Sequence, residues 1–136
     1  MKALESFAKN IESNLEISGV VGIDFTVILT ILPMLLQLFQ SCKAPVPPNP
    51  NPSPTPSEQK AWELKCTATS AYDETQADYS RPVLHRMATH IRRQKKKKDG
   101  EPISRSDALE LARASLDEAR TAPIEEIAAG IEEVGE

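Results

Sequence analysis

Prolines are concentrated in one short stretch of this chain. Seven of its eleven prolines fall between Pro45 and Pro56. Proline has no amide hydrogen and pushes the residue before it toward extended geometry, so this stretch forms neither a helix nor a central strand. At about 3.1 Å per residue, a polyproline-II segment of this length reaches ~40 Å. The sequence therefore predicts an extended spacer over residues 43–57, between an N-terminal part (residues 1–42) and a C-terminal part (residues 58–136).

The same stretch contains a P-x-x-P motif that runs from Pro45 to Pro48. Aromatic grooves bind peptides of this kind, because their backbone is already extended before binding. Any proline-dense stretch contains such a motif, so the spacer is the favoured interpretation and the docking peptide is the alternative.

The N-terminal part predicts two helices. Apolar residues recur at helical spacing over residues 2–16, namely at Leu4, Phe7, Ala8, Ile11 and Leu15. Residues 25–39 then form the most apolar stretch of the chain. As a helix it spans about 22 Å, whereas a bilayer core needs roughly 30 Å. Extending it back to residue 17 supplies the length but includes Asp24, which costs at least ~2.5 kcal/mol at mid-membrane. Asp24 suits the N-cap of this helix instead.

Two placements of the apolar helix are equally favoured: insertion in a membrane, or burial between subunits of an assembly. A third placement, in a core formed by the chain itself, is disfavoured because apolar residues make up only 40% of the chain and aromatic residues 4%. In either favoured case the contact residues are the large apolar ones, Phe25, Ile28, Leu29, Leu32, Leu35, Leu36 and Phe39.

The C-terminal part predicts short amphipathic helices that begin after capping residues. Ser57, Ser80 and Ser104 each precede a helical pattern, and Pro123 introduces the last one. The predicted fold is therefore mostly α and not compact, with an N-terminal hydrophobic helix that is a transmembrane candidate, a proline-rich extended spacer and a small C-terminal helical module.

Charge is strongly segregated within this module. Residues 81–98 hold eight Lys or Arg and no acid, a charge of +8, whereas residues 99–136 carry a net −8. A basic run neutralises phosphates of nucleic acid or lipid, or the acidic segment of the same protein or a neighbouring subunit. All three partners remain open, and the predicted contact residues are Arg92, Arg93, Lys95, Lys96, Lys97 and Lys98.

No motif of catalysis or of cofactor binding occurs in the chain. It lacks G-x-G-x-x-G, the P-loop pattern and H-E-x-x-H, and His85 and His90 are five residues apart, which places them on different faces of a helix. Cys42 and Cys66 have no metal-ligand spacing and favour a reducing compartment. The sequence thus predicts no enzymatic activity, no metal, no cofactor and no small-molecule substrate.

These features predict a structural or interaction protein. In the leading hypothesis it is a multi-copy component of a virion-like or membrane-associated assembly, anchored by the apolar helix and joined to a partner subunit through the spacer. In the alternative hypothesis it binds nucleic acid, free or tethered to a membrane, through the basic residues 81–98.

Overall fold

The computed structural model describes residues 2–42 and 45–135 of the chain, and helices account for most of both ranges. In chain order the α-helices are α1 (Lys2–Ile17), α2 (Phe25–Ser41), α3 (Pro56–Tyr72), α4 (Ala77–Asp99), α5 (Arg105–Thr121) and α6 (Ile124–Val134), with a 3-10 turn at Glu74–Gln76 between α3 and α4. No strand occurs in the two described ranges. The prediction of a mostly α protein is confirmed.

Two of the predicted helix caps are confirmed. Asp24 caps α2, because its carboxylate accepts a hydrogen bond of 3.0 Å from the amide of Val27. Ser104 caps α5 in the same way, with its hydroxyl 3.1 Å from the amide of Asp107. These side chains satisfy amides that a helix start leaves without a partner.

Two other predicted caps are wrong. Thr55, not Ser57, caps α3, because it forms a reciprocal capping box with Glu58. Ser80 lies inside α4, where its buried hydroxyl donates to the Ala71 carbonyl at 2.6 Å and joins α4 to α3.

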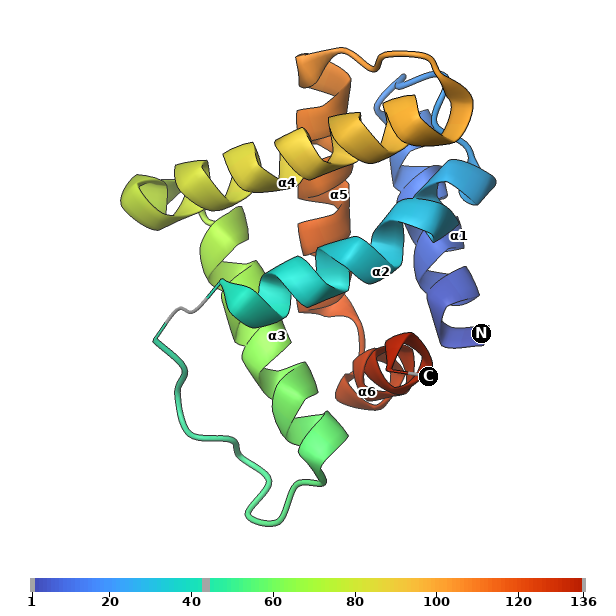
Figure 1. Cartoon of the computed structure of the whole chain (residues 1–136). Helices are drawn as coiled ribbons and strands as arrows, with labels where there is room; N and C mark the ends of the chain where they lie inside the picture. Colours follow the sequence, from blue (N-terminus) through green and yellow to red (C-terminus); the bar gives the residue numbers. More distant parts are fainter. Residues whose placement is uncertain (1, 43–44, 136) are drawn as a thin grey trace.

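Helix α2 is buried by the chain itself, which corrects the placements expected from the sequence. Five of its predicted contact residues are at most 2% exposed, namely Ile28, Leu32, Leu35, Leu36 and Phe39. Phe25 and Leu29 are partly buried against the same core. Helices α1, α3 and α4 pack against α2 and provide the cover (Figure 1).

Alanines explain why the sequence suggested too little material for a core. Five of them are fully buried on the helices that pack against α2, namely Ala8, Ala61, Ala68, Ala71 and Ala88. Small side chains let helix axes approach closely, so a core forms without many large apolar residues. All six helices contribute to one buried cluster, and the expectation of non-compact helices is wrong.

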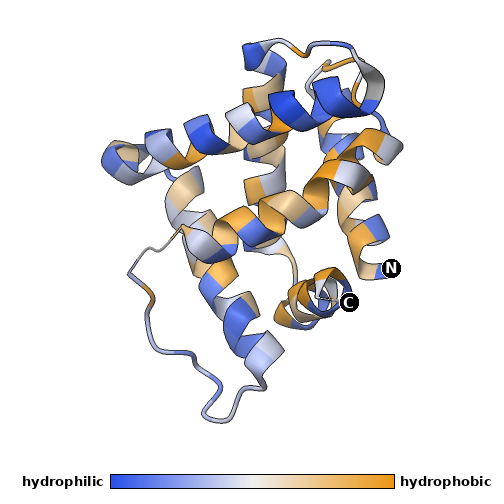
Figure 2. Ribbon diagram, viewed as in Figure 1, coloured by the Kyte–Doolittle hydropathy of each residue, from blue (hydrophilic) through white to orange (hydrophobic). Residues whose placement is uncertain are grey.

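The transmembrane prediction is also wrong. Within residues 2–42 and 45–135, no helix has both the length and the apolar composition that crossing a membrane demands. Figure 2 colours most of α2 as hydrophobic, and the buried residues of this helix belong to the core of the same molecule.

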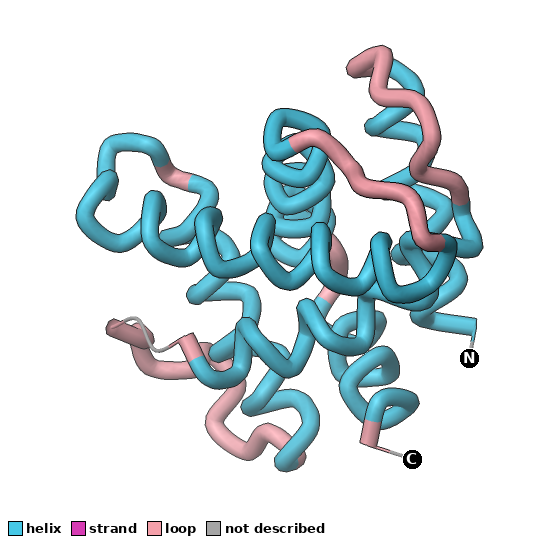
Figure 3. The backbone as a smooth tube through the Cα atoms, turned by 45° about the horizontal axis from the view of Figure 1, so that its top comes forward, coloured by secondary structure: helices cyan, strands magenta, loops and turns pink. Residues whose placement is uncertain are grey.

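The proline-rich segment forms a long loop beside α3 (Figures 1 and 3). Residues 45–55 contain no helix, and Lys43 and Ala44 lie outside the described residues. The indole Nε1 of Trp62 donates to the Pro47 carbonyl at 2.8 Å, and Asn49 donates to Gln59 at 3.1 Å. Because α2 and α3 pack directly against each other, this segment does not hold the two parts of the chain apart.

A glycine inside α6 offers a stabilising substitution. Gly130 is buried in mid-helix, and a Cβ added there meets Leu4 and Phe7 side-chain atoms at 3.7 Å, an ordinary contact distance. We expect Gly130→Ala to raise the free energy of unfolding by about 1 kcal/mol, because glycine is a poor helix former. Urea denaturation measures this change. Gly100→Ala is the opposite control, because Gly100 ends α4 with a φ of 74°, a conformation that disfavours a side chain. An unchanged or lower midpoint for Gly130→Ala contradicts the packing described for α6.

Candidate functional site: the cationic face of α4

Helix α4 divides into a buried face and a charged face. Val83, Met87, Ala88 and Ile91 are at most 5% exposed and pack against neighbouring helices. Helix α4 contacts α2, α3 and α5, and crosses the upper part of the molecule in Figure 1. Hydrophilic residues cover its opposite side (Figure 2). The basic residues are therefore sorted by helical position rather than by their order in the sequence.

Three of the six predicted contact residues are engaged within the molecule. Lys95 is only 6% exposed, because its position follows Ile91 by one helical turn and faces inward. Lys98 donates to the Thr26 carbonyl at 2.9 Å and to the Thr30 hydroxyl at 2.6 Å, which joins the end of α4 to the start of α2.

Arg92 has a different role, between α4 and the segment that follows it. Its Nε donates to the Ile103 carbonyl at 3.2 Å. The side chain remains exposed, so its other N–H groups point into solvent space.

Five cations of α4 are exposed and make no hydrogen bond or ion pair with any described residue. They are Arg81, Arg86, Arg93, Lys96 and Lys97. Three of these belong to the predicted contact set, whereas Arg81 and Arg86 lie in the basic stretch but outside that set. The spacing of Arg81 and Arg86 along the helix was the signal in the sequence that could have added them to the predicted contact set.

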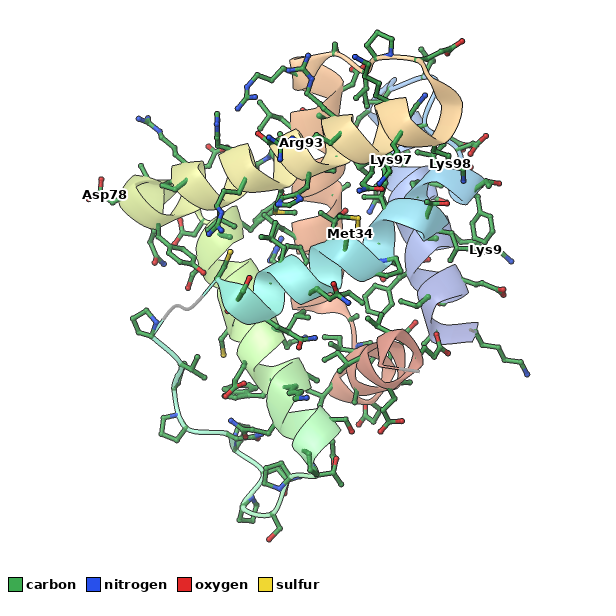
Figure 4. The ribbon with its side chains drawn as sticks, in the orientation of Figure 1. Lys9, Met34, Asp78, Arg93, Lys97 and Lys98 are labelled. Carbon is green, nitrogen blue, oxygen red and sulfur yellow. The ribbon has the colours of Figure 1, made fainter. Side chains whose placement is uncertain are left out.

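The helical repeat aligns three of these five charges along α4. Arg86, Arg93 and Lys97 stand at i, i+7 and i+11, which keeps them within about 40° of one another around the axis and spreads them over ~16 Å. Figure 4 labels Arg93 and Lys97 on the charged half of the helix and Asp78 at its opposite end. The exposed side chains of Arg86, Arg93 and Lys97 therefore form one line of positive charge along α4.

The acidic helices make their described contacts away from this surface. The carboxylate of Glu133 accepts from the amides of Ala3 and Leu4, both at 3.1 Å, and so caps α1. Burial raises the pKa of Glu133 and the two amide hydrogen bonds lower it, and the pKa lies below its ordinary value. Glu132 accepts from the Ser57 hydroxyl at 2.7 Å.

Two of the three arginines of α5, Arg113 and Arg120, are used in a cluster that sequence analysis did not find. The guanidinium groups of Arg113 and Arg120 lie 4.7 and 4.3 Å from the centre of the Tyr72 ring. Arg113 also pairs with Glu74 at 3.0 Å, and Arg120 with Asp117 at 2.7 Å. Such cation–π contacts join α3 to α5 and occupy both cations within the fold.

A buried carboxylate in α5 makes the fold sensitive to pH. Glu118 is 9% exposed and accepts a 2.8 Å hydrogen bond from Asn10. Burial raises the pKa of Glu118, the bond from Asn10 partly offsets this, and the neighbouring Glu126 and Asp117 raise it further. Because the folded-state pKa lies above the unfolded-state value, the contribution of this group to stability is complete at acidic pH and is lost as the pH rises through the folded-state pKa.

We therefore expect Glu118→Gln to stabilise the protein at neutral pH by about 1 kcal/mol, since the amide keeps a hydrogen-bonding oxygen without the buried charge. Thermal unfolding of both proteins at neutral and acidic pH measures the difference, which should vanish at acidic pH. Glu110→Gln, on the exposed side of the same helix, is the matched control. A gain of equal size at both pH values would show that charge is not its cause.

The described residues contain no group of three or more His, Cys, Asp or Glu side chains that could hold a metal ion. Cys42 is buried and Cys66 partly buried, and the two thiols are not joined. Burial raises the pKa of the Cys66 thiol, and so does the nearby Glu63. A raised pKa lowers the fraction of the reactive thiolate at neutral pH. Comparison with known proteins adds no further assignment: no protein-family model, no characterised protein and no solved structure matches this chain.

Proposed function

We propose that this chain is a non-enzymatic interaction protein that binds nucleic acid through the charged face of α4. The observation that carries the proposal is the set of five exposed cations on one helix that have no partner among the described residues. Cations held on a rigid helix without internal partners are available to replace the counterions of a phosphate backbone.

The absence of a stacking surface on α4 favours a duplex over a single strand. The aromatic residue of α4, Tyr79, is half-buried and donates to the Cys42 carbonyl at 3.1 Å. Burial raises the pKa of this phenol most, and the nearby Cys42 raises it further. Single-strand binding without sequence preference relies on exposed aromatic rings, whereas phosphate contacts to a duplex do not.

Like the assembly hypothesis, the proposal describes an interaction protein. Unlike that hypothesis, it gives α2 no role as an anchor. That hypothesis assigned α2 to a membrane or to neighbouring subunits. Because the chain's own helices cover α2, no outside partner is needed to bury its apolar face. Acidic segments of another protein and anionic lipid remain as competing partners for the cations of α4.

Equilibrium binding of the full chain to a short duplex of random sequence tests the proposal. We expect a Kd in the range of about 1–100 µM at physiological salt, indifferent to sequence, and a slope of roughly −3 to −4.5 for log K against log salt concentration. Anionic vesicles serve as the competing surface. No measurable binding to duplex at low salt, or tighter binding to vesicles than to duplex, would overturn the proposal.

A further inference from the structure

A surface cavity lies beside the charged face of α4, where the chain turns back after the end of the helix. Its volume is about 320 Å³, and its walls come from α4 and from the segment that leads to α5. The lining residues are Thr89, Arg92, Arg93, Lys96, Pro102 and Ile103.

Among the described residues, the side chains that line this cavity offer positive charge and no carboxylate. Arg92, Arg93 and Lys96 supply up to thirteen N–H groups in total, about five from each guanidinium and three from the ammonium group. The hydroxyl of Thr89 donates to the His85 carbonyl at 2.9 Å, so its proton is directed at the helix and not into the cavity. Three other cavities of the molecule each include a carboxylate, from Glu63, Asp117 and Glu74 respectively. The charge of this cavity therefore selects an anion.

One cation of the cavity is held in place before any ligand binds. The 3.2 Å hydrogen bond from Arg92 Nε to the Ile103 carbonyl fixes the guanidinium at the wall and leaves its terminal N–H groups unused by that bond. The turn that makes this contact possible begins at Gly100, whose φ of 74° ends α4, and it buries Ile103 to 7% exposure. A positioned guanidinium loses less conformational freedom on binding than a mobile one.

The geometry points to this cavity as a phosphate site, which we propose seats one phosphate group of the bound strand between Arg92, Arg93 and Lys96. A phosphate offers several acceptor oxygens at short range, and arginine matches two of them at once. The identification of this phosphate as part of a nucleic-acid strand rests on the proposed function. Recognition of the phosphate group itself depends only on the cavity.

Inorganic phosphate, titrated into the uniformly 15N-labelled full chain, is the probe. We expect saturable amide shifts confined to residues around the cavity, with a Kd on the order of 1 mM, and none with chloride at matched ionic strength. Arg93→Gln with Lys96→Gln should weaken phosphate binding about tenfold or more, since two of the three charges are lost. Neither side chain makes a hydrogen bond or ion pair with a described residue, so we expect the variant to retain the structure.

Lys2→Gln with Lys60→Gln is the matched control, because it removes the same charge from exposed helix positions on α1 and α3, outside the cavity and outside α4. We expect it to change phosphate affinity by less than about twofold. Equal losses in the two variants, or shifts spread along the whole of α4, would overturn the site.

The two proposals can fail separately in these measurements. If duplex binds but phosphate gives no local shifts, the site is overturned and the proposed function stands. Local phosphate binding without duplex binding overturns the proposed function and leaves a site for free phosphate.

Discussion

Leu35→Ala should lower the free energy of unfolding by about 3 kcal/mol. Leu35 is 1% exposed in the middle of α2, and removing its side chain leaves a cavity that the surrounding helices fill only in part. The loss should appear in urea denaturation of the full chain as a lower midpoint with an unchanged slope. Gln37→Ala, two residues away on the exposed side of α2, should change stability by no more than ~0.5 kcal/mol.

This measurement also separates a core within one chain from an interface between chains. If the chain's own helices bury α2, the unfolding midpoints of wild type and Leu35→Ala do not depend on protein concentration. A midpoint that rises with protein concentration, together with a small effect of Leu35→Ala at high dilution, would return α2 to the role of a subunit contact.

Replacing Arg93, Lys96 and Lys97 together by glutamine should have the largest effect on binding. If each contacts one phosphate, the slope of log K against log salt for duplex binding becomes shallower by about 2.7, and affinity at low salt falls on the order of a hundredfold. All three side chains are exposed and without described partners, so the loss reflects the binding surface and not the stability of α4.

The chain supplies a control with the same net charge. Lys2, Lys9 and Lys60 are exposed on α1 and α3, and Figure 4 labels Lys9 beside α1. Replacing these three by glutamine should leave the salt slope within about 0.5 of the wild-type value, because none of them belongs to α4 and none is expected to contact a phosphate there. Equal losses in the two triple variants would mean that net charge, not the face of α4, controls binding.

Local chemistry made much of the helical framework predictable. Asp24 and Ser104 satisfy amides within three residues of themselves, so their roles as caps depend on nearby sequence alone. Ser80 was mistaken for a cap because its partner, the Ala71 carbonyl, belongs to another helix. A polar residue that serves tertiary packing leaves no local signal.

The sequence predicted that α2 is a helix more easily than it predicted where this helix packs. Large apolar residues in α2 are conspicuous, whereas the alanines that cover it contribute little to a count of apolar material. Ala61, Ala68 and Ala88 are all fully buried, and their value comes from the close approach of backbones rather than from their own surface. Which helices approach one another depends on the whole chain.

The basic stretch shows what the charge count conceals. Eight cations and no acid within residues 81–98 predict a positive segment, but helical geometry turns Lys95 into the protein and directs Lys98 to α2. The inward direction of Lys95 follows from its spacing to Ile91 and was available in the sequence. The contact between Lys98 and Thr26 joins residues far apart in the chain and was not.

Glu133 holds the start of α1 close to the end of α6. By holding the first amides of α1, this side chain places the beginning of the first helix against the end of the last one, and Figure 1 places both away from α4. A chain immobilised or fused through either end therefore presents α4 outward, toward the solution. The termini and α4 thus lie on opposite sides of the molecule. Several copies attached side by side through their termini would all direct α4 away from the support.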